Sequence, residues 1–146
     1  MRFDGEYEPS TWKWVRDQAA AYEASGGKEA NTLRDSDMQI IVMTTVGHKT
    51  GKVRKVPLMR VEHEGAYAIV GSKGGAPANP GWVSNLLADP VVLVQDGPEP
   101  HEYDVRLAAG EERSTWWDRS VAVFPPYAEY QGKTTREIPL FIATRR

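Results

Sequence analysis

A cluster of basic residues between two apolar runs is the first feature of the chain that could do chemistry. Six of the fourteen residues from 47 to 60 can carry positive charge and none is acidic, although the formal net charge of the chain is −2. Gly47 and Gly51 bracket Lys49-Thr50, which suits a tight turn that needs a positive φ. Such a turn offers backbone N–H groups and fixed positive charge to an anion. On this stretch alone, an exposed hairpin with scattered charges is an equal alternative.

A second glycine-rich stretch, residues 71–82, follows the strand-like residues 66–70. It combines the hydroxyl of Ser72, the cation of Lys73 and small residues that let a ligand approach the backbone. Asn79-Pro80 is typical of a helix N-cap followed by the first helical residue, and the free N–H groups at the start of such a helix attract anions. Two turns of this kind, each ending a strand, favour one shared anionic ligand.

Most standard catalytic and metal sites are missing from the sequence. The chain has no cysteine, which excludes thiol nucleophiles, Fe–S clusters and thiolate zinc sites. His48, His63 and His101 have no partners at metal-ligand spacing, so no metal is expected. Lys49-Thr50 resembles the end of a P-loop, but the upstream glycine spacing and the following helix are missing. What remains is a site that holds a large anionic cofactor and leaves the chemistry to it, as in hydride transfer.

Composition sets further bounds on the class of protein. The chain has 146 residues, of which 40% are apolar, with five Trp and six Tyr, and this is enough for one core in one domain. There is no signal-peptide pattern and no apolar run near ~18 residues, so we expect a soluble, cytoplasmic protein. A net charge of −2 and a pI near 5.9 argue against a nucleic-acid partner.

The hydrophobic pattern predicts strands joined by short turns, with helices before, between and after them. The predicted strands are 38–45, 53–61, 65–71, 91–95, 101–107 and 138–144, and the predicted helices are 10–24, 80–88 and 108–123. Short connections predict an antiparallel meander. We therefore expect an α+β fold built around a small antiparallel barrel. Residues 1–37 would be an N-terminal helix and linker, and residues 38–146 the barrel.

The predicted N-terminal helix begins with Ser10 or Thr11 as its N-cap and ends at Ser25-Gly26-Gly27. Four apolar side chains fall at helical spacing along it: Trp12, Val15, Ala19 and Tyr22. We interpret this stripe as an amphipathic helix packed on the core. A lid over a ligand and a helix lying on a membrane surface are the alternatives.

Beyond these patterns, the chain resembles the deazaflavin-dependent nitroreductase family, whose members use coenzyme F420. The resemblance covers about residues 38–142, and it rests on the order and spacing of its motifs more than on any one of them. The motifs are Thr44-Thr45-x-Gly47-x-Lys49-Thr50-Gly51-x-x-Arg54, Val56-Pro57-Leu58, Ser72-Lys73-Gly74-Gly75, Asn79-Pro80-x-Trp82-x-x-Asn85-Leu86, Phe124-Pro125-x-Tyr127-x-x-Tyr130-Gln131 and Ile138-Pro139-Leu140. The resemblance implies a mostly antiparallel split β-barrel with flanking helices, as in pyridoxamine-phosphate-oxidase-like proteins.

The resemblance also implies a reaction and a site. The protein would transfer a hydride from reduced coenzyme F420 to an electron-poor small molecule, which could be a quinone, an α,β-unsaturated carbonyl or a nitroaromatic. The implied cofactor-binding residues are His48, Lys49, Thr50, Gly51, Arg54, Lys55, Val56, Pro57, Leu58, Met59, Ser72, Lys73, Gly74, Trp82 and Asn85. Among them, His48, Lys49, Thr50 and Arg54 would meet the phosphate and the acidic tail of the cofactor.

The implied substrate-binding residues are Met59, Tyr127 and Tyr130. The two tyrosines lie three positions apart, so one helical turn would present both on one face. Tyr127 is the candidate catalytic residue, because a phenol can orient an acceptor oxygen or donate a proton. At the position of Met59 the family's nitroreductase carries a tyrosine. This difference argues against nitroimidazole activation and leaves cofactor binding intact.

Two rival functions and several structural alternatives stay open from the sequence. The first rival is a split-barrel oxidoreductase that uses flavin mononucleotide (FMN), and the second is a non-catalytic protein that carries coenzyme F420. Pro57 could simply interrupt an edge strand, Trp82 could be a core aromatic, and Tyr130 could pack at the rim. The resemblance further allows a membrane-surface contact or a lid role for the N-terminal helix, and it leaves the oligomeric state open.

Overall fold

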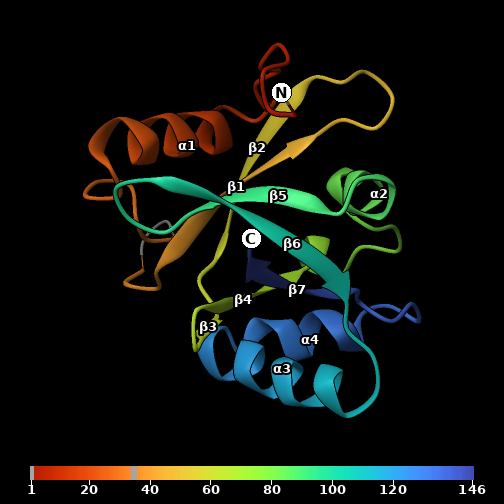
Figure 1. Cartoon of the computed structure of the whole chain (residues 1–146). Helices are drawn as coiled ribbons and strands as arrows, with labels where there is room; N and C mark the ends of the chain where they lie inside the picture. The colour runs from red at the N-terminus through yellow and green to blue at the C-terminus, as the bar shows by residue number, and fades with distance from the viewer. Residues whose placement is uncertain (1, 34–35) are drawn as a thin grey trace.

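The computed structural model describes residues 2–33 and 36–146, which form one curled sheet with helices on both sides (Figure 1). The strands are β1 (Ile40–Val46), β2 (Val53–Met59), β3 (Glu62–His63), β4 (Ala66–Val70), β5 (Val91–Gln95), β6 (Pro100–Leu107) and β7 (Leu140–Arg145). The helices are α1 (Lys13–Ser25), α2 (Gly81–Ala88), α3 (Gly110–Val123), α4 (Pro126–Gly132) and the short 3₁₀ turn η1 (Lys73–Gly75).

The described strands pair in the order β2-β1-β5-β6-β7-β4-β3, and every neighbouring pair is antiparallel. The two strands at opposite ends of this order, β2 and β3, are separated by only two residues of the chain. The sheet must therefore curl so that its two ends approach each other. The predicted fold class, an α+β protein with a mostly antiparallel split barrel, is confirmed.

The predicted strand 53–61 is wrong in its extent, because the chain changes partner within it. The N–H of Arg60 still donates to the carbonyl of Gln39 beside β1, whereas the carbonyl of Val61 accepts from Ala68 at the other end of the sheet. The sequential meander is also wrong, since β1 pairs with β5 and β4 pairs with β7. One predicted strand thus serves two different strand ladders.

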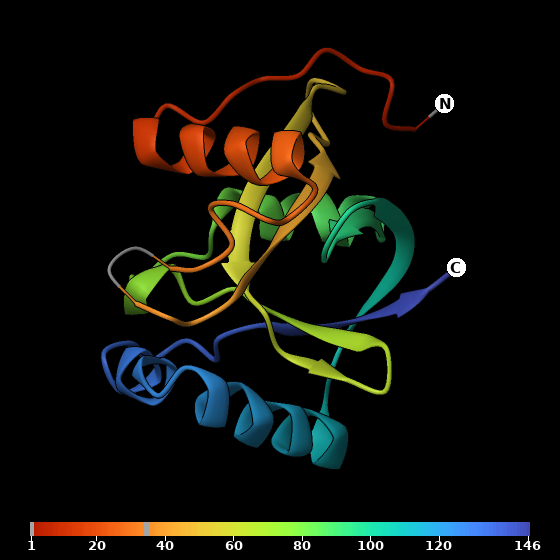
Figure 2. The same ribbon diagram turned by 90° about the vertical axis from the view of Figure 1, so that its left-hand side faces the viewer.

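Side chains of β1 alternate between two apolar cores, which explains why its first four residues are all apolar. Ile41 and Met43 are fully buried together with Leu86 of α2. Ile40 faces the opposite core with Tyr22 of α1. Figure 2 shows α1 above the curled sheet and the α3–α4 pair below it, and all three helices contribute side chains to the core that contains Ile40. These helices and the sheet edge formed by β2 enclose the region where the site lies.

The start of α1 differs from the sequence-based prediction. The N-cap residue is Trp12, and no side chain makes a capping bond there. The hydroxyl oxygen of Ser10 accepts a bond from the N–H of Trp12, which precedes the helix. The predicted end is confirmed, because Gly26 adopts a φ of 64° as the C-cap.

Candidate functional site

The turn between β1 and β2 is held by its two glycines for different reasons. Gly51 has a φ of 69°, as the sequence predicted, and its N–H donates to the carbonyl of Gly47 at 2.8 Å. Gly47 is needed for space, since a Cβ there would lie 2.9 Å from the hydroxyl of Thr50. The turn therefore leaves Lys49 and Thr50 exposed on a fixed backbone.

Helix α2 fixes this turn through Asn85. The Asn85 side-chain oxygen lies 3.1 Å from the backbone nitrogen of His48 and 2.7 Å from its Nδ1. A backbone N–H can only donate, so the atom facing it is the amide oxygen, and Nδ1 must then also carry a hydrogen. The Asn85 amide nitrogen lies 3.5 Å from the hydroxyl of Thr45. Nε2 of His48 is left for solvent or a ligand.

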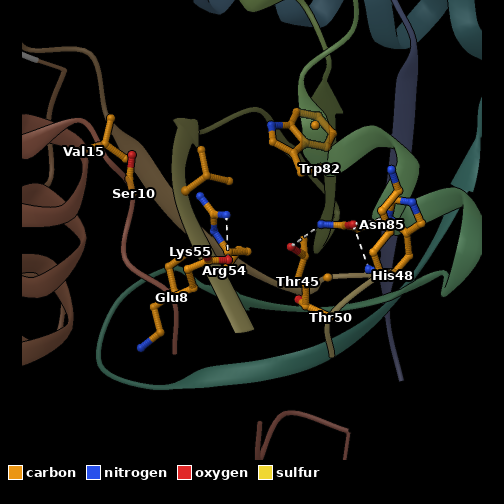
Figure 3. Close-up of a pocket in the computed structure, with 14 residues that line it drawn as sticks. Glu8, Ser10, Val15, Thr45, His48, Thr50, Arg54, Lys55, Trp82 and Asn85 are labelled. Atoms are coloured by element: carbon orange, nitrogen blue, oxygen red, sulfur yellow. Dashed lines mark hydrogen bonds and ion pairs between the residues drawn. The ribbon is translucent and has the colours of Figure 1, made fainter. Parts of the chain in front are cut away.

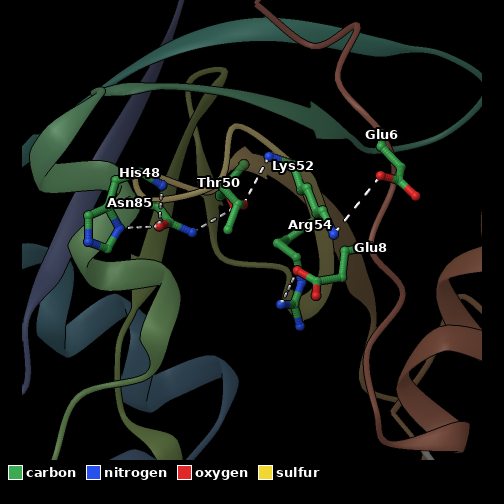
Figure 4. A network of polar contacts seen from close by, with 8 residues as sticks. Glu6, Glu8, His48, Thr50, Lys52, Arg54 and Asn85 are labelled. Carbon is green, nitrogen blue, oxygen red and sulfur yellow. Dashed lines mark hydrogen bonds and ion pairs between the residues drawn. The ribbon is translucent and has the colours of Figure 1, made fainter.

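Three basic residues around the start of β2, at positions 52, 54 and 55, already have acidic partners. Arg54 pairs with Glu8 at 3.1 Å, Lys52 lies 4.0 Å from Glu6, and Lys55 lies 2.8 Å from Glu23. Glu6 and Glu8 come from the segment before α1 (Figure 4). No such pair involves Lys49 or Lys73 within residues 2–33 and 36–146, so these two ammonium groups are available to a ligand.

A hollow of about 350 Å³ opens beside this turn, and we call it the cationic hollow. Figure 3 shows Arg54 with Glu8 on one side of it and His48 with Asn85 on the other. Its lining residues are Glu8, Ser10, Val15, Thr45, Gly47, His48, Lys49, Thr50, Arg54, Lys55, Val56, Gly81, Trp82 and Asn85. Four of them are basic and one is acidic, so the hollow suits an anion.

The glycine-rich loop after β4 has an unusual backbone. Lys73, Gly74 and Gly75 have φ values of 46°, 62° and 80° in succession. A Cβ at Gly75 would lie 2.7 Å from the carbonyl oxygen of Tyr130 in α4, so this glycine allows a close approach. A lysine at positive φ is strained, and such strain tends to gather at ligand sites.

Arg136 holds this loop from the far side. Its guanidinium donates to the carbonyls of Ala76 at 2.9 Å, Gly71 at 3.2 Å and Ser72 at 2.7 Å. It also donates to the side-chain oxygen of Asn79 at 2.7 Å. The predicted N-cap role of Asn79 is therefore wrong, because its side chain is used by Arg136 and α2 starts without a side-chain cap.

A second and larger hollow of about 590 Å³ lies beside the first, and we call it the apolar hollow. Its lining residues are Trp12, Trp14, Val15, Val56, Pro57, Leu58, Met59, Val70, Ser72, Lys73, Gly74, Pro80, Trp82, Phe124, Tyr127 and Tyr130. Three residues line both hollows, namely Val15, Val56 and Trp82. The two hollows therefore adjoin and form one site with a charged end and an apolar end.

Tyr127 is a buried polar residue of the apolar hollow. Its side chain is 5% exposed and packs edge-on against Phe124, with ring centres 4.9 Å apart. Burial raises the pKa of Tyr127, and the neighbouring Tyr130 adds to this shift. No described residue forms a hydrogen bond with its hydroxyl. Tyr127 therefore offers a protonated hydroxyl without a partner to a molecule in the hollow.

The structure gathers nearly all of the residues that the sequence singled out. Every proposed cofactor or substrate residue lines one of the two hollows except Gly51, which shapes the turn. Trp82 was considered either as a core aromatic or as a cofactor-binding residue. It packs near Phe141 and also lines both hollows, so its position fits both roles. Pro57 likewise lies on the edge strand β2 and lines the apolar hollow.

Eleven lining residues were not among the predicted site residues, namely Glu8, Ser10, Trp12, Trp14, Val15, Thr45, Gly47, Val70, Pro80, Gly81 and Phe124. Glu8 and Ser10 carry no motif, so no local signal could have placed them at the cationic hollow. The apolar stripe of α1 did hold a signal. Core packing is confirmed for Ala19 and Tyr22, but Trp12 is 67% exposed and lies at the apolar hollow.

In residues 2–33 and 36–146 no group of three or more His, Asp or Glu residues could hold a metal ion. Over the same residues no helix has both the length and the hydropathy to cross a bilayer.

Comparison with known proteins gives a consistent result. A model of the F420H(2)-dependent quinone reductase family matches residues 14–145. An F420H(2)-dependent quinone reductase of Mycobacterium tuberculosis is 33% identical over 138 residues, which cover 87% of each chain. A solved F420-H2-dependent reductase (FDR-A) is 53% identical, with a TM-score of 0.68 over 71% of this chain and 92% of that one. A solved chain described as a domain-swapped dimer is 47% identical, with a TM-score of 0.71 over 92% of this chain and 99% of that one.

Proposed function

Because the chain belongs to the F420H(2)-dependent quinone reductase family, it is an oxidoreductase that uses coenzyme F420, and we propose that it passes a hydride from the reduced coenzyme to a quinone. Membership of this family favours an F420-dependent enzyme over the two alternatives considered from the sequence, which were an FMN enzyme and a non-catalytic carrier of coenzyme F420.

The observation that carries the proposal is the contact between two hollows of opposite character. A cationic hollow of about 350 Å³ adjoins an apolar hollow of about 590 Å³ across Val15, Val56 and Trp82. Sites for small molecules typically have volumes of about 300–1,000 Å³. A ligand with an aromatic ring at one end and a phosphate with an acidic tail at the other matches both hollows at once.

In this arrangement the cationic hollow binds the anionic end of the coenzyme. Lys49 contributes an ammonium group that no described acid neutralises, and Arg54 contributes a guanidinium. His48 presents Nε2, since Asn85 occupies its Nδ1. Thr50 adds a hydroxyl on the same turn. These groups supply charge-assisted hydrogen bonds, which are stronger than bonds between neutral groups.

The apolar hollow holds the ring and the acceptor. Pro57, Leu58 and Met59 form one wall along β2, and Ser72 with Lys73 offers donors to ring oxygens. When bound, the reduced coenzyme supplies the hydride. Tyr127 donates a hydrogen bond to the quinone oxygen that gains negative charge as the hydride arrives, which orients the quinone and stabilises that charge.

The lining of the apolar hollow favours a quinone over a nitroimidazole as the acceptor. Met59 is 7% exposed and offers a soft, adaptable apolar contact. A tyrosine in its place would supply a hydroxyl that could bind a nitro group. We therefore expect Met59→Tyr to raise the ratio of nitroimidazole to quinone turnover, and an unchanged ratio would contradict this assignment.

Trp12 and Trp14 are placed to contact the quinone or the surface from which it comes. Trp12 is 67% exposed and Trp14 is 37% exposed at the apolar hollow. Tryptophan is favoured where one end of a side chain is apolar and the other is wet. If α1 meets a membrane surface, Trp12→Ala will lower cosedimentation with lipid vesicles. A pure lid role predicts a raised KM for the quinone with no change in cosedimentation.

A binding titration tests the cofactor assignment directly. Fluorescence quenching is measured as the purified protein is titrated with coenzyme F420 and, separately, with FMN. We expect much tighter binding of the deazaflavin, because FMN has no acidic tail to use the cationic hollow. Equal affinity for the two cofactors would contradict the assignment.

A further inference from the structure

The segment before α1 is fastened along the outer edge of β2 by its backbone. Val53 donates its N–H to the carbonyl of Glu6 at 2.8 Å and accepts at its own carbonyl from the N–H of Glu8 at 2.9 Å. Gly5 crosses so close to Gly51 that a Cβ there would lie 2.4 Å from the carbonyl oxygen of Gly51. We call residues 5–8 the N-terminal strap. Its backbone is therefore held by main-chain bonds and a close glycine contact that do not involve the carboxylate of Glu8.

The strap brings a carboxylate into the cationic hollow. Glu8 lies 3.1 Å from Arg54, and of the described residues that line the two hollows it is the one with a negative charge. Glu6 sits farther out, 4.0 Å from Lys52. The side chains of Glu8 and Arg54 are 44% and 42% exposed, so a rotation of the Glu8 side chain suffices to separate them.

We propose that Glu8 is a specificity-determining residue whose carboxylate competes with the anionic end of a ligand for Arg54. The inference rests on the proposed function in that it takes this end to be the phosphate and acidic tail of the coenzyme. A ligand anion must displace Glu8 from Arg54 or bind beside it against like-charge repulsion. The negative charge of a ligand therefore contributes less to its affinity. Discrimination between anionic ligands then depends more on the ring that enters the apolar hollow.

The opposite role is that Glu8 positions Arg54 for the ligand, and the two roles differ in sign. Glu8→Gln keeps the length of the side chain and an oxygen that can accept from Arg54 while it removes the charge. Competition predicts tighter anion binding in this variant, whereas positioning predicts unchanged or weaker binding. Glu29→Gln is the matched control, because Glu29 is exposed, lines neither hollow and changes the net charge equally.

The experiment uses calorimetric titration of the full chain with three probes. They are inorganic tripolyphosphate, coenzyme F420, and the same deazaflavin trimmed of its phosphate and acidic tail. We expect Glu8→Gln to bind tripolyphosphate and the full coenzyme about two- to fivefold more tightly at low salt, as removal of a partly exposed charge contact implies. The trimmed deazaflavin and the Glu29→Gln protein should show no change. In ~1 M salt, where the screening length is about 3 Å, the gain should vanish.

Equal or weaker tripolyphosphate binding in Glu8→Gln, or no binding to either protein, overturns the inference. Gly5→Ala is a second variant, since it forces the strap away from β2 and should tighten tripolyphosphate binding in the same direction. The two proposals can fail separately. If wild-type protein binds neither deazaflavin, the proposed function fails while tripolyphosphate still tests Glu8. If the deazaflavins bind and Glu8→Gln gives no gain, the inference alone fails.

Discussion

The side-chain oxygen of Asn85 lies 2.7 Å from Nδ1 of His48 and 3.1 Å from its backbone nitrogen, which ties α2 to the β1–β2 turn. Asn85 is buried and His48 is exposed. The amide oxygen of Asn85 therefore holds the turn from the protein interior and also sets the tautomer of the imidazole. Lys49 and Thr50 follow directly in the chain. The position of the cationic groups is therefore set by a helix that also lines the cationic hollow.

Asn85→Ala is expected to loosen the turn and weaken anion binding together. Loss of the bonds to His48 should lower the free energy of unfolding by about 1–2 kcal/mol. The dissociation constant for coenzyme F420 should rise, because the turn loses its anchor. Urea unfolding and a binding titration measure the two effects. Ser84→Ala, on the exposed face of the same helix, is the control, and equal behaviour of the two variants would argue against the anchoring role.

Lys49→Ala and Arg54→Ala should both weaken coenzyme binding without unfolding the protein. Loss of one charge-assisted bond corresponds to about tenfold in affinity, or ~1.5 kcal/mol. Arg54→Ala should cost more than Lys49→Ala, because it also leaves the carboxylate of Glu8 without its partner in the hollow. Adding Glu8→Gln to Arg54→Ala should recover part of the loss.

Titration of these variants and of Lys28→Ala, an exposed lysine outside both hollows, measures the difference. Unchanged dissociation constants in both Lys49→Ala and Arg54→Ala would return these residues to the status of exposed surface charges.

The sequence predicted the parts of the site that depend on local patterns. The glycines around Lys49 and Lys73, and the spacing of Tyr127 and Tyr130, identify turns and one helical face without any knowledge of the fold. Glu8 and Arg54 are 46 positions apart, and their contact depends on where the N-terminal segment lies. Arg136 reaches the loop at Ser72 from 64 positions away for the same reason.

The same limit explains the errors in the predicted elements. Asparagine is a favourable residue at a helix N-cap. In this structure, however, the side chain of Asn79 accepts a charge-assisted bond from the guanidinium of Arg136, which comes from a distant segment. No glycine or proline after Pro57 marks an end to the predicted strand 53–61, yet the curl of the sheet requires the chain to leave β1 near Arg60. Both outcomes are decided by tertiary contacts that short-range patterns do not contain.

Tyr127→Phe is expected to reduce turnover more than coenzyme affinity. The ring and its contact with Phe124 stay, so only the hydroxyl is lost. Hydrogen-bond or proton donation of this kind typically contributes on the order of 10²–10⁴-fold, so kcat/KM for a quinone should fall clearly. Tyr130→Phe is the comparison on the same helical face. Wild-type kcat/KM in Tyr127→Phe would leave Tyr127 as a wall of the hollow.

Stability should fall at alkaline pH because buried tyrosines keep their protons in the folded state. Burial raises the pKa of Tyr127, and burial together with the bond to Asp96 raises the pKa of Tyr67. In the unfolded chain a tyrosine loses its proton near a pKa of about 10. Above that pH the folded state holds more protons, so the free energy of unfolding decreases as pH rises. Urea unfolding from pH 8 to 11 should show this decline, with a shallower slope in Tyr127→Phe. Identical slopes would show that Tyr127 does not contribute.

The most direct test of the central claim is quinone-dependent oxidation of the reduced coenzyme. Purified protein is mixed anaerobically with reduced coenzyme F420, and reappearance of the oxidised deazaflavin spectrum is followed with and without a soluble quinone. We expect rapid reoxidation that requires both protein and quinone and that slows in Tyr127→Phe. Reoxidation no faster than in the protein-free mixture, with the coenzyme shown to be bound, would contradict the claim.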